Sequence, residues 1–223
     1  MDIHKPKAAH SWREFAIEIG TIVCGIVIAL LLEQAVESFH WRHEVEAERE
    51  SLLAEAKDNV TTAAYRAAAD TCVRQRLRDI EEGFLRHAKG QPLGFVRSVA
   101  RPPNWIATTS SWDIAVTGQA LLHMPREERL KFSDAFDTYR AFAAIRREED
   151  GIWRRLTLLD HPDILEAGDW VALHMAFGEA LSMNERIATL TQYMRGAAAL
   201  GQKPALFEGV DAQRLQAFCT PLF

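Results

Sequence analysis

The side chains with the clearest potential for chemistry are two histidines and a glutamate that follow an apolar stretch. His40 and His43 lie about one helical turn apart, and Glu44 comes directly after them. Imidazole nitrogens and carboxylates are zinc ligands, so these residues could assist a metal-dependent hydrolysis with distant groups such as His174 or Asp113. Their order departs from H-E-x-x-H, however, and no third nearby ligand is identifiable. We keep a metal-assisted hydrolase as the alternative to our first hypothesis, a non-enzymatic scaffold, sensor or partner-binding module, and we assign no metal site.

A second group that suggests chemistry is the run of four hydroxyl residues at 108–111. A nucleophilic hydroxyl needs an adjacent general base, and none is visible in the pattern around these residues. Ser110 and Asp113 instead have the spacing of a capping box, with Asp in place of the usual Glu or Gln. We therefore predict a helix start here, and we assign no catalytic residue and no cofactor.

Cysteine and charge usage exclude further classes of function. Cys24, Cys72 and Cys219 are far apart and form no CxxC pair, which indicates neither a zinc site nor a disulfide scaffold. Cys72 and Cys219 could form a bridge if the protein faces an oxidising compartment, but their spacing does not decide this. The net charge is -5, and basic residues alternate with acidic ones. This pattern argues against a nucleic-acid partner.

An apolar stretch near the N-terminus predicts contact with lipid. Residues 19–32 contain no charge, and residues 15–36 are long enough to cross a bilayer, which takes about 20 apolar residues. Apolar side chains cover every face, whereas the later helices are amphipathic. A buried core helix and a cleaved signal peptide are the alternatives, but no A-x-A-like cleavage site follows the stretch. We predict a transmembrane helix that is an uncleaved signal anchor.

Flanking residues set the expected orientation of this anchor. Three Lys or Arg residues precede the span and two follow it closely, so the positive-inside rule favours a cytoplasmic N-terminus. Trp41 has the side chain expected at the membrane interface. We predict a cytoplasmic tail over 1–14, a transmembrane helix over 15–36 and a soluble domain over 37–223. The expected location is a bacterial inner membrane, with the domain in the periplasm.

One face of the predicted span is rich in small residues. Glu18, Thr21, Gly25, Ala29 and Glu33 recur at helical intervals, which places all five on the same side. Small residues allow another helix to approach closely, and a carboxylate in a membrane requires a partner. The face is then a packing surface for a homodimer or another membrane protein. Alternatively, the two glutamates reach water at the interfaces and the small residues are incidental.

Helical periodicity dominates the remainder of the chain, and no alternating strand pattern appears. Apolar residues recur every three or four positions in each long segment, and the row in the last long helix also includes Asn184. Breakers at Gly90, Pro92, Pro102 and Pro103 predict a connecting loop. The expected fold is all-α, an N-terminal transmembrane helix followed by an antiparallel helical bundle. The helices are expected over 44–87, 108–123, 126–160, 168–200 and 211–218.

The anchor segment resembles a family of bacterial single-span membrane proteins to which no activity is assigned. The resemblance rests on residues 14–23 and 25–30, which have an EIG-type start, and on 41–44. A weaker pattern runs from Trp112 to Leu122, with Tyr139 beyond it. The family pattern has Trp-Asn after the span, where this chain has Trp41 between His40 and Arg42. The resemblance implies an inner-membrane protein and carries over no functional residue.

Overall fold

All regular structure in the described part of the chain is helical, which confirms the predicted all-α class. The computed structural model describes residues 12–206 and 208–223. The predicted tail over 1–14 lies mostly outside these residues. The elements in chain order are α1 (Trp12–Ala88), α2 (Ser110–Ala115), α3 (Ala120–His123), α4 (Arg126–Leu156), η1 (Thr157–Asp160), η2 (Pro162–Ile164), α5 (Ala167–Arg195), η3 (Ala197–Ala199) and α6 (Gly209–Phe218).

Helix α1 is one continuous helix of 77 residues that includes both the predicted span and the first helix of the domain. No Pro interrupts it, and its first Gly in the domain is Gly83. Two compact units divide the chain, Met1–Ala47 and Glu48–Phe223. The first unit consists, where described, of the N-terminal part of α1. The second contains the rest of α1 and every later element.

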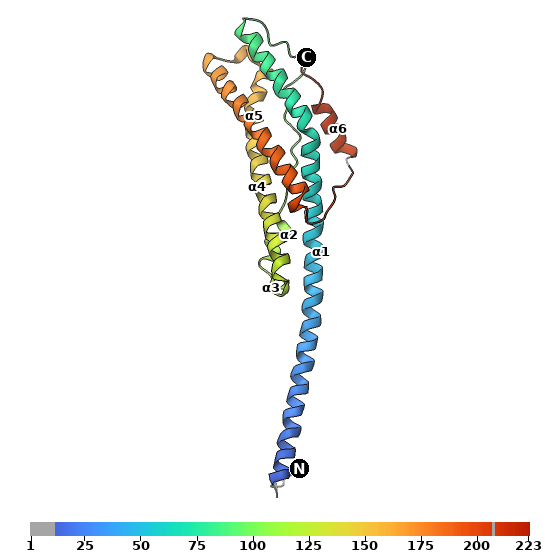
Figure 1. The fold of residues 1–223 in the computed structure, drawn as a ribbon. Coiled ribbons are helices and arrows are strands. Elements are labelled where there is room, and N and C mark those ends of the chain that lie inside the picture. The colour runs from blue at the N-terminus through green and yellow to red at the C-terminus, as the bar shows by residue number, and fades with distance from the viewer. Residues whose placement is uncertain (1–11, 207) are drawn as a thin grey trace, which may run out of the picture. The chain divides into compact units, whose positions relative to one another are not determined.

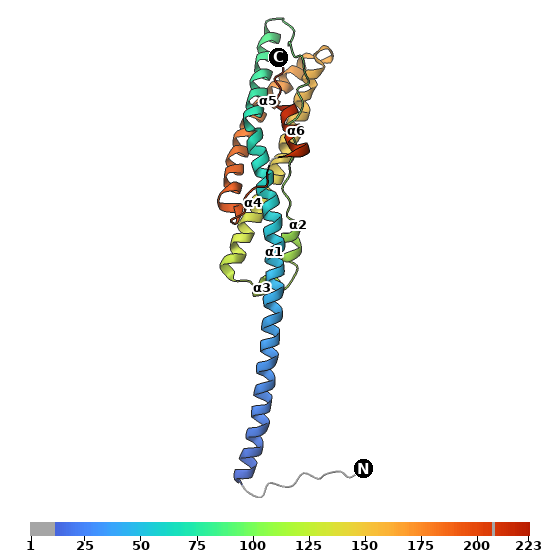
Figure 2. The same ribbon diagram turned by 90° about the vertical axis from the view of Figure 1, so that its right-hand side faces the viewer.

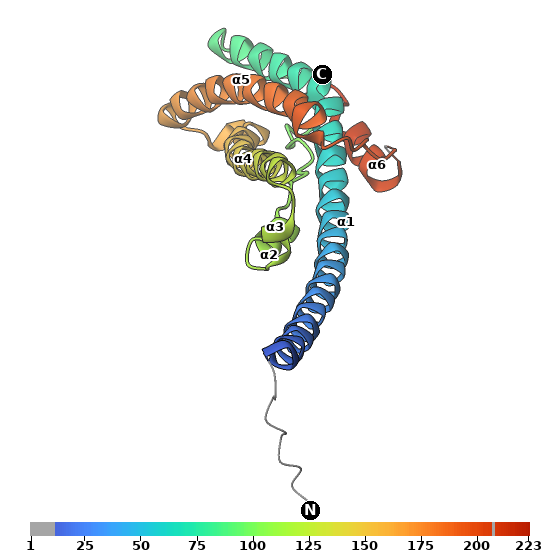
Figure 3. The same ribbon diagram turned by 60° about the horizontal axis from the view of Figure 1, so that its bottom comes forward.

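Three long helices form the core of the second unit (Figures 1 and 2). Arg49 pairs with Glu128 and Arg66 with Glu149, so α1 and α4 run in the same direction. Tyr193 donates a hydrogen bond to Asp134, whereas Glu179 near the other end of α5 pairs with Arg155. Helix α5 is therefore antiparallel to α4. Figure 3 looks almost along α4 and shows α5 lying across it.

The core contains most of the residues that the apolar periodicity predicted. Leu52, Val60 and Ile80 of α1 are buried, and so are Phe136 and Tyr139 of α4. The hydroxyl of Tyr139 donates to the carbonyl of Ala198 at 2.5 Å, and burial raises the pKa of this hydroxyl above its usual value. Leu181, which belongs to the apolar row predicted for the last long helix, is an exception, since it is 45% exposed in a cavity between α1 and α5. Apolar periodicity alone does not identify where the buried face of a helix ends and its exposed face begins.

The predicted helix over 108–123 is two short helices, because a turn around Gly118 separates α2 from α3. The predicted capping box is also wrong. The amides of Ser110 and Ser111 donate to the carboxylate of Glu55 at 2.9 and 2.8 Å. A side chain of α1 thus satisfies the free N–H groups at the start of α2. This contact also attaches the loop before α2 to α1.

Helix α5 begins at Ala167, one residue before the predicted start at 168, and a capping box at Glu166 precedes it. The amide of Glu166 donates to the Asp169 carboxylate at 2.8 Å, and the Glu166 side chain accepts from the N3 amide. The helix ends at Arg195 and not near residue 200. Gly196 follows it and leads into the short η3 turn.

Candidate functional site

The apolar part of α1 is fully accessible in the structure. Every residue from 12 to 40 is exposed, and an 18-residue apolar window in α1 has none of its residues buried. A stable soluble protein rarely exposes such a large contiguous apolar surface. By length and composition, this helix is compatible with a membrane anchor or with a signal sequence. The core helix of a soluble protein would be mostly buried, whereas none of this apolar window is.

The five residues of the predicted packing face are exposed and pack against no other helix among residues 12–206 and 208–223. A side-chain carbon added at Gly25 would meet open space. The hydroxyl of Thr21 donates to the carbonyl of Ile17 at 2.9 Å, so it is satisfied within the helix. The indole of Trp41 donates to Glu37 at 3.3 Å. Packing of a second helix here stays a prediction.

The residues proposed for metal-assisted hydrolysis do not form a metal centre. His40, His43 and Glu44 belong to the first unit, whereas Asp113 and His174 belong to the second. Within residues 12–206 and 208–223, no group of three or more His, Cys, Asp or Glu side chains is arranged to hold a metal ion. Asp113 instead pairs with Arg140, and His174 stacks on Phe84.

A buried ion network occupies the centre of the three long helices. Arg66 of α1 donates to Glu149 of α4 at 2.8 Å and to Asn184 of α5 at 2.7 Å. Arg146, one helical turn from Glu149, forms an ion pair with the same carboxylate. Both arginines and the glutamate have side chains at most 2% exposed. Burial lowers the pKa of Arg66 to about 10 and that of Arg146 to about 9, and both remain charged at neutral pH.

Sequence reasoning missed this network, although a signal for it existed. Arg66 follows Ala63 by three positions and so continues the buried row of α1. Arg146 and Glu149 continue the buried row of Tyr139 in the same way. A charged residue in an apolar row indicates a buried partner, because an unpaired buried charge is very costly.

A second site ties the C-terminus to α1, and of its contacts the sequence left open only the disulfide. The sulfur atoms of Cys72 and Cys219 form a disulfide whose Cα atoms lie 4.8 Å apart. One turn further along α1, Arg76 donates to the carbonyls of Phe218 and Thr220 at 2.6 and 2.7 Å. Asp79 accepts from the amide of Leu222 at 2.9 Å. Consecutive turns of α1 thus hold the last residues of the chain.

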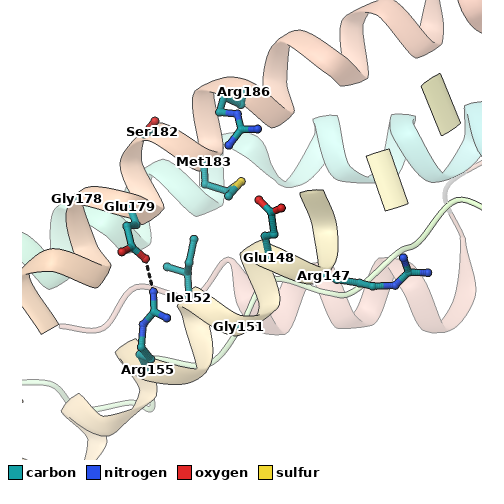
Figure 4. A pocket seen from close by; sticks show the side chains of 10 residues that line it. All are labelled: Arg147, Glu148, Gly151, Ile152, Arg155, Gly178, Glu179, Ser182, Met183 and Arg186. Atoms are coloured by element: carbon teal, nitrogen blue, oxygen red, sulfur yellow. Dashed lines mark hydrogen bonds and ion pairs between the residues drawn. The ribbon is translucent and has the colours of Figure 1, made fainter. Parts of the chain in front are cut away.

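The outer side of α4 and α5 contains an open groove of about 710 Å³. Figure 4 shows Glu148 and Ile152 rising from α4 towards Met183 of α5, with Arg155 and Glu179 forming an ion pair across the groove. Ser182 is its only hydroxyl residue, and the lining contains neither His nor Cys. This composition suits contact with a polar partner better than nucleophilic chemistry. The lining residues are Arg147, Glu148, Gly151, Ile152, Arg155, Gly178, Glu179, Ser182, Met183 and Arg186.

Comparison with known proteins yields no match among family models, curated proteins or solved structures. The resemblance of the anchor to a family of bacterial single-span proteins therefore stays a prediction.

Proposed function

We propose that this protein is a single-pass anchored module of the bacterial cell envelope that binds a partner and catalyses no reaction. Residues 15–36 cross the inner membrane, the N-terminus is cytoplasmic, and the helical domain lies in the periplasm. The observation that carries the proposal is the complete exposure of the apolar segment of α1. Lipid is the solvent that removes the free-energy cost of exposing this surface to water.

The disulfide supports the periplasmic side for the domain. Disulfides persist in oxidising compartments such as the periplasm, whereas thiols are kept reduced in the cytosol. Cys72 and Cys219 are 147 residues apart and are paired, while Cys24 in the apolar segment is free. If the domain lay on the cytoplasmic side, Cys72 and Cys219 would be two free thiols and not a disulfide.

A binding role is favoured over catalysis by the surface of the domain. The groove between α4 and α5 presents Arg147, Glu148 and Arg186, to which the structure gives no ion-pair partner within the described residues. Such side chains can pair with a partner of complementary charge, and electrostatic complementarity chiefly sets specificity.

Topology is the decisive test. Alkaline phosphatase, which is active only when oxidised, would be fused after Phe223, and an otherwise identical fusion would be made to a chain lacking residues 15–36. We expect activity from the first fusion alone, and protease added to spheroplasts should degrade the domain. Mass spectrometry of the membrane-bound chain should find residue 13, because cleavage as a signal sequence would remove it. An inactive first fusion, or loss of that residue, would contradict the proposal.

The packing face requires a separate test. If two spans associate through it, Gly25→Ile should reduce crosslinked dimer in membranes, whereas Ile26→Leu on a neighbouring face should not. Recovery of monomer alone from the unsubstituted chain, with no other crosslinked protein, would contradict a packing role.

A further inference from the structure

The segment that contains α2 and α3 is apolar on both of its sides. Its buried inner side chains are Trp112, Ala115, Leu121 and Met124. Its exposed outer side chains, which we call the apolar tip, are Ile114, Val116 and Leu122. A helix that is apolar all round is normally covered on every side. The bundle covers the inner side of this segment and leaves the apolar tip exposed.

The apolar tip lies at the end of the second unit where α1 enters it (Figures 1 and 2). Arg129 of α4 donates to the carbonyl of Leu121 at 3.0 Å, which holds α3 beside the start of α4. The preceding residue, Glu128, pairs with Arg49 at the beginning of the second unit. Because α1 and α4 run in the same direction, the residues before Glu128 lie on the side from which α1 arrives.

The chain between this end of the unit and the predicted membrane interface is short. Trp41, whose side chain is expected at the interface, precedes Arg49 by eight residues of the same helix. Eight residues of helix measure about 12 Å, and the headgroup layer extends beyond the hydrocarbon core on this side. Exposed apolar side chains also occur at the opposite end of the unit, as at Ile164, but they lack this proximity.

We propose that the apolar tip inserts into the headgroup layer of the membrane that α1 spans, so that the domain rests on the bilayer surface. Apolar side chains leave water at that depth, and nearby cations contact lipid phosphates. Arg126 and Lys131 at the start of α4 are exposed and supply such cations. Asp113, the only charged residue over 112–122, is already paired with Arg140. This inference rests on the proposed transmembrane position of residues 15–36.

Fluorescence quenching by spin-labelled lipid in the reconstituted full-length protein tests this contact. Each variant carries Cys24→Ala and one new cysteine with a polarity-sensitive fluorophore, attached without reductant so that the disulfide stays closed. The vesicles contain phosphatidylethanolamine and phosphatidylglycerol, with or without nitroxide-bearing lipid. The label at Leu122→Cys should lose emission when the nitroxide is present. The matched control is Ile164→Cys, since Ile164 is 72% exposed and Leu122 is 73% exposed, and its label should keep its emission. A label at Leu31→Cys reports insertion of the apolar segment.

Negative charge at the apolar tip should release it from the membrane. With the label at Gln119→Cys, the pair Val116→Glu and Leu122→Glu should abolish the quenching, because carboxylates are repelled by anionic headgroups and are costly to remove from water. The pair Ile164→Glu and Val171→Glu adds the same charge at exposed positions of the opposite end and should leave the quenching unchanged.

The outcomes separate this contact from the anchor itself. Quenching at Leu31→Cys without quenching at Leu122→Cys would overturn the contact and leave the anchor in place. Quenching at neither position would overturn the anchor and the contact together. Equal quenching at Leu122→Cys and Ile164→Cys would show that the tip is not special. A tip label that emits at shorter wavelength but is not quenched would indicate cover by protein, such as a second copy, and would also overturn the proposal.

Discussion

Glu149 lies at the centre of the buried ion network between α1 and α4. It is the single buried carboxylate that both Arg66 and Arg146 contact. Arg146 also donates to the carbonyl of Pro103 at 2.7 Å, so the network reaches the loop before α2. Charge in the core therefore links α1, α4 and this loop at one place.

Removing the charge of Glu149 should destabilise the whole domain. Glu149→Gln removes the carboxylate that both buried guanidiniums contact, and breaking a buried pair in this way costs about 3–5 kcal/mol. Urea denaturation followed by circular dichroism measures the change. Glu148→Gln, at the neighbouring exposed position, is the matched control and should shift the free energy of unfolding by less than about 0.5 kcal/mol. Equal effects of the two variants would contradict the role given to Glu149.

Arg76 has a different role, because its partners are backbone carbonyls. It donates to Ser98 and Val99 in the loop after α1, as well as to two residues of the C-terminal segment. Its guanidinium also lies 5.0 Å from the ring centre of Phe218. One side chain thus joins three segments that are far apart in the sequence.

Arg76→Gln should therefore loosen the C-terminal segment. The buried carbonyls lose a charged donor, and hydrogen bonds to charged groups contribute about 1.5–3 kcal/mol each. We expect faster amide hydrogen exchange over 218–223 than in the unsubstituted chain. Arg78→Gln, at an exposed position of the same helix, should leave exchange in that segment unaltered. Unchanged exchange in Arg76→Gln would show that the other contacts suffice.

At the scale of elements, the disulfide between Cys72 and Cys219 also attaches the C-terminal segment to α1. It closes a loop of 147 residues between α1 and the end of α6. Cross-links over long loops restrict the unfolded chain strongly, which is one account of how they stabilise the folded state.

Loss of the disulfide should lower stability without removing the helices. The double variant Cys72→Ala, Cys219→Ala is expected to lose about 2–5 kcal/mol of unfolding free energy. Denaturant midpoints with and without reductant provide the measurement. The unsubstituted chain should become less stable on reduction, whereas the double variant should not respond. Cys24→Ala is the control, since that thiol is free. A response of the double variant to reductant would contradict this account.

At the scale of the whole molecule, the proposed membrane location rests on the apolar segment of α1. A charged residue at the centre of a span costs about 2.5–3.5 kcal/mol on insertion. The double substitution Val27→Arg, Ile28→Arg should therefore move much of the full-length chain out of the membrane fraction. Ser38→Arg, beyond the predicted span, should have no such effect. Fractionation and immunoblotting measure both, and retention of the double variant in membranes would argue against a transmembrane span.

The sequence by itself determined the helical class, the long first helix, the apolar segment and most core positions. These features follow from local periodicity and composition, since burial of one helix face requires a repeat of about 3.6 residues. The break between α2 and α3 was missed because a single Gly118 is a weak signal in a short segment.

Only the tertiary structure decided which distant side chains meet. The pairing of Cys72 with Cys219, the capping of α2 by Glu55 and the ion network around Glu149 join residues that are far apart in the chain. Their contacts depend on how the helices pack, and a charge or thiol has no periodic pattern that names its partner.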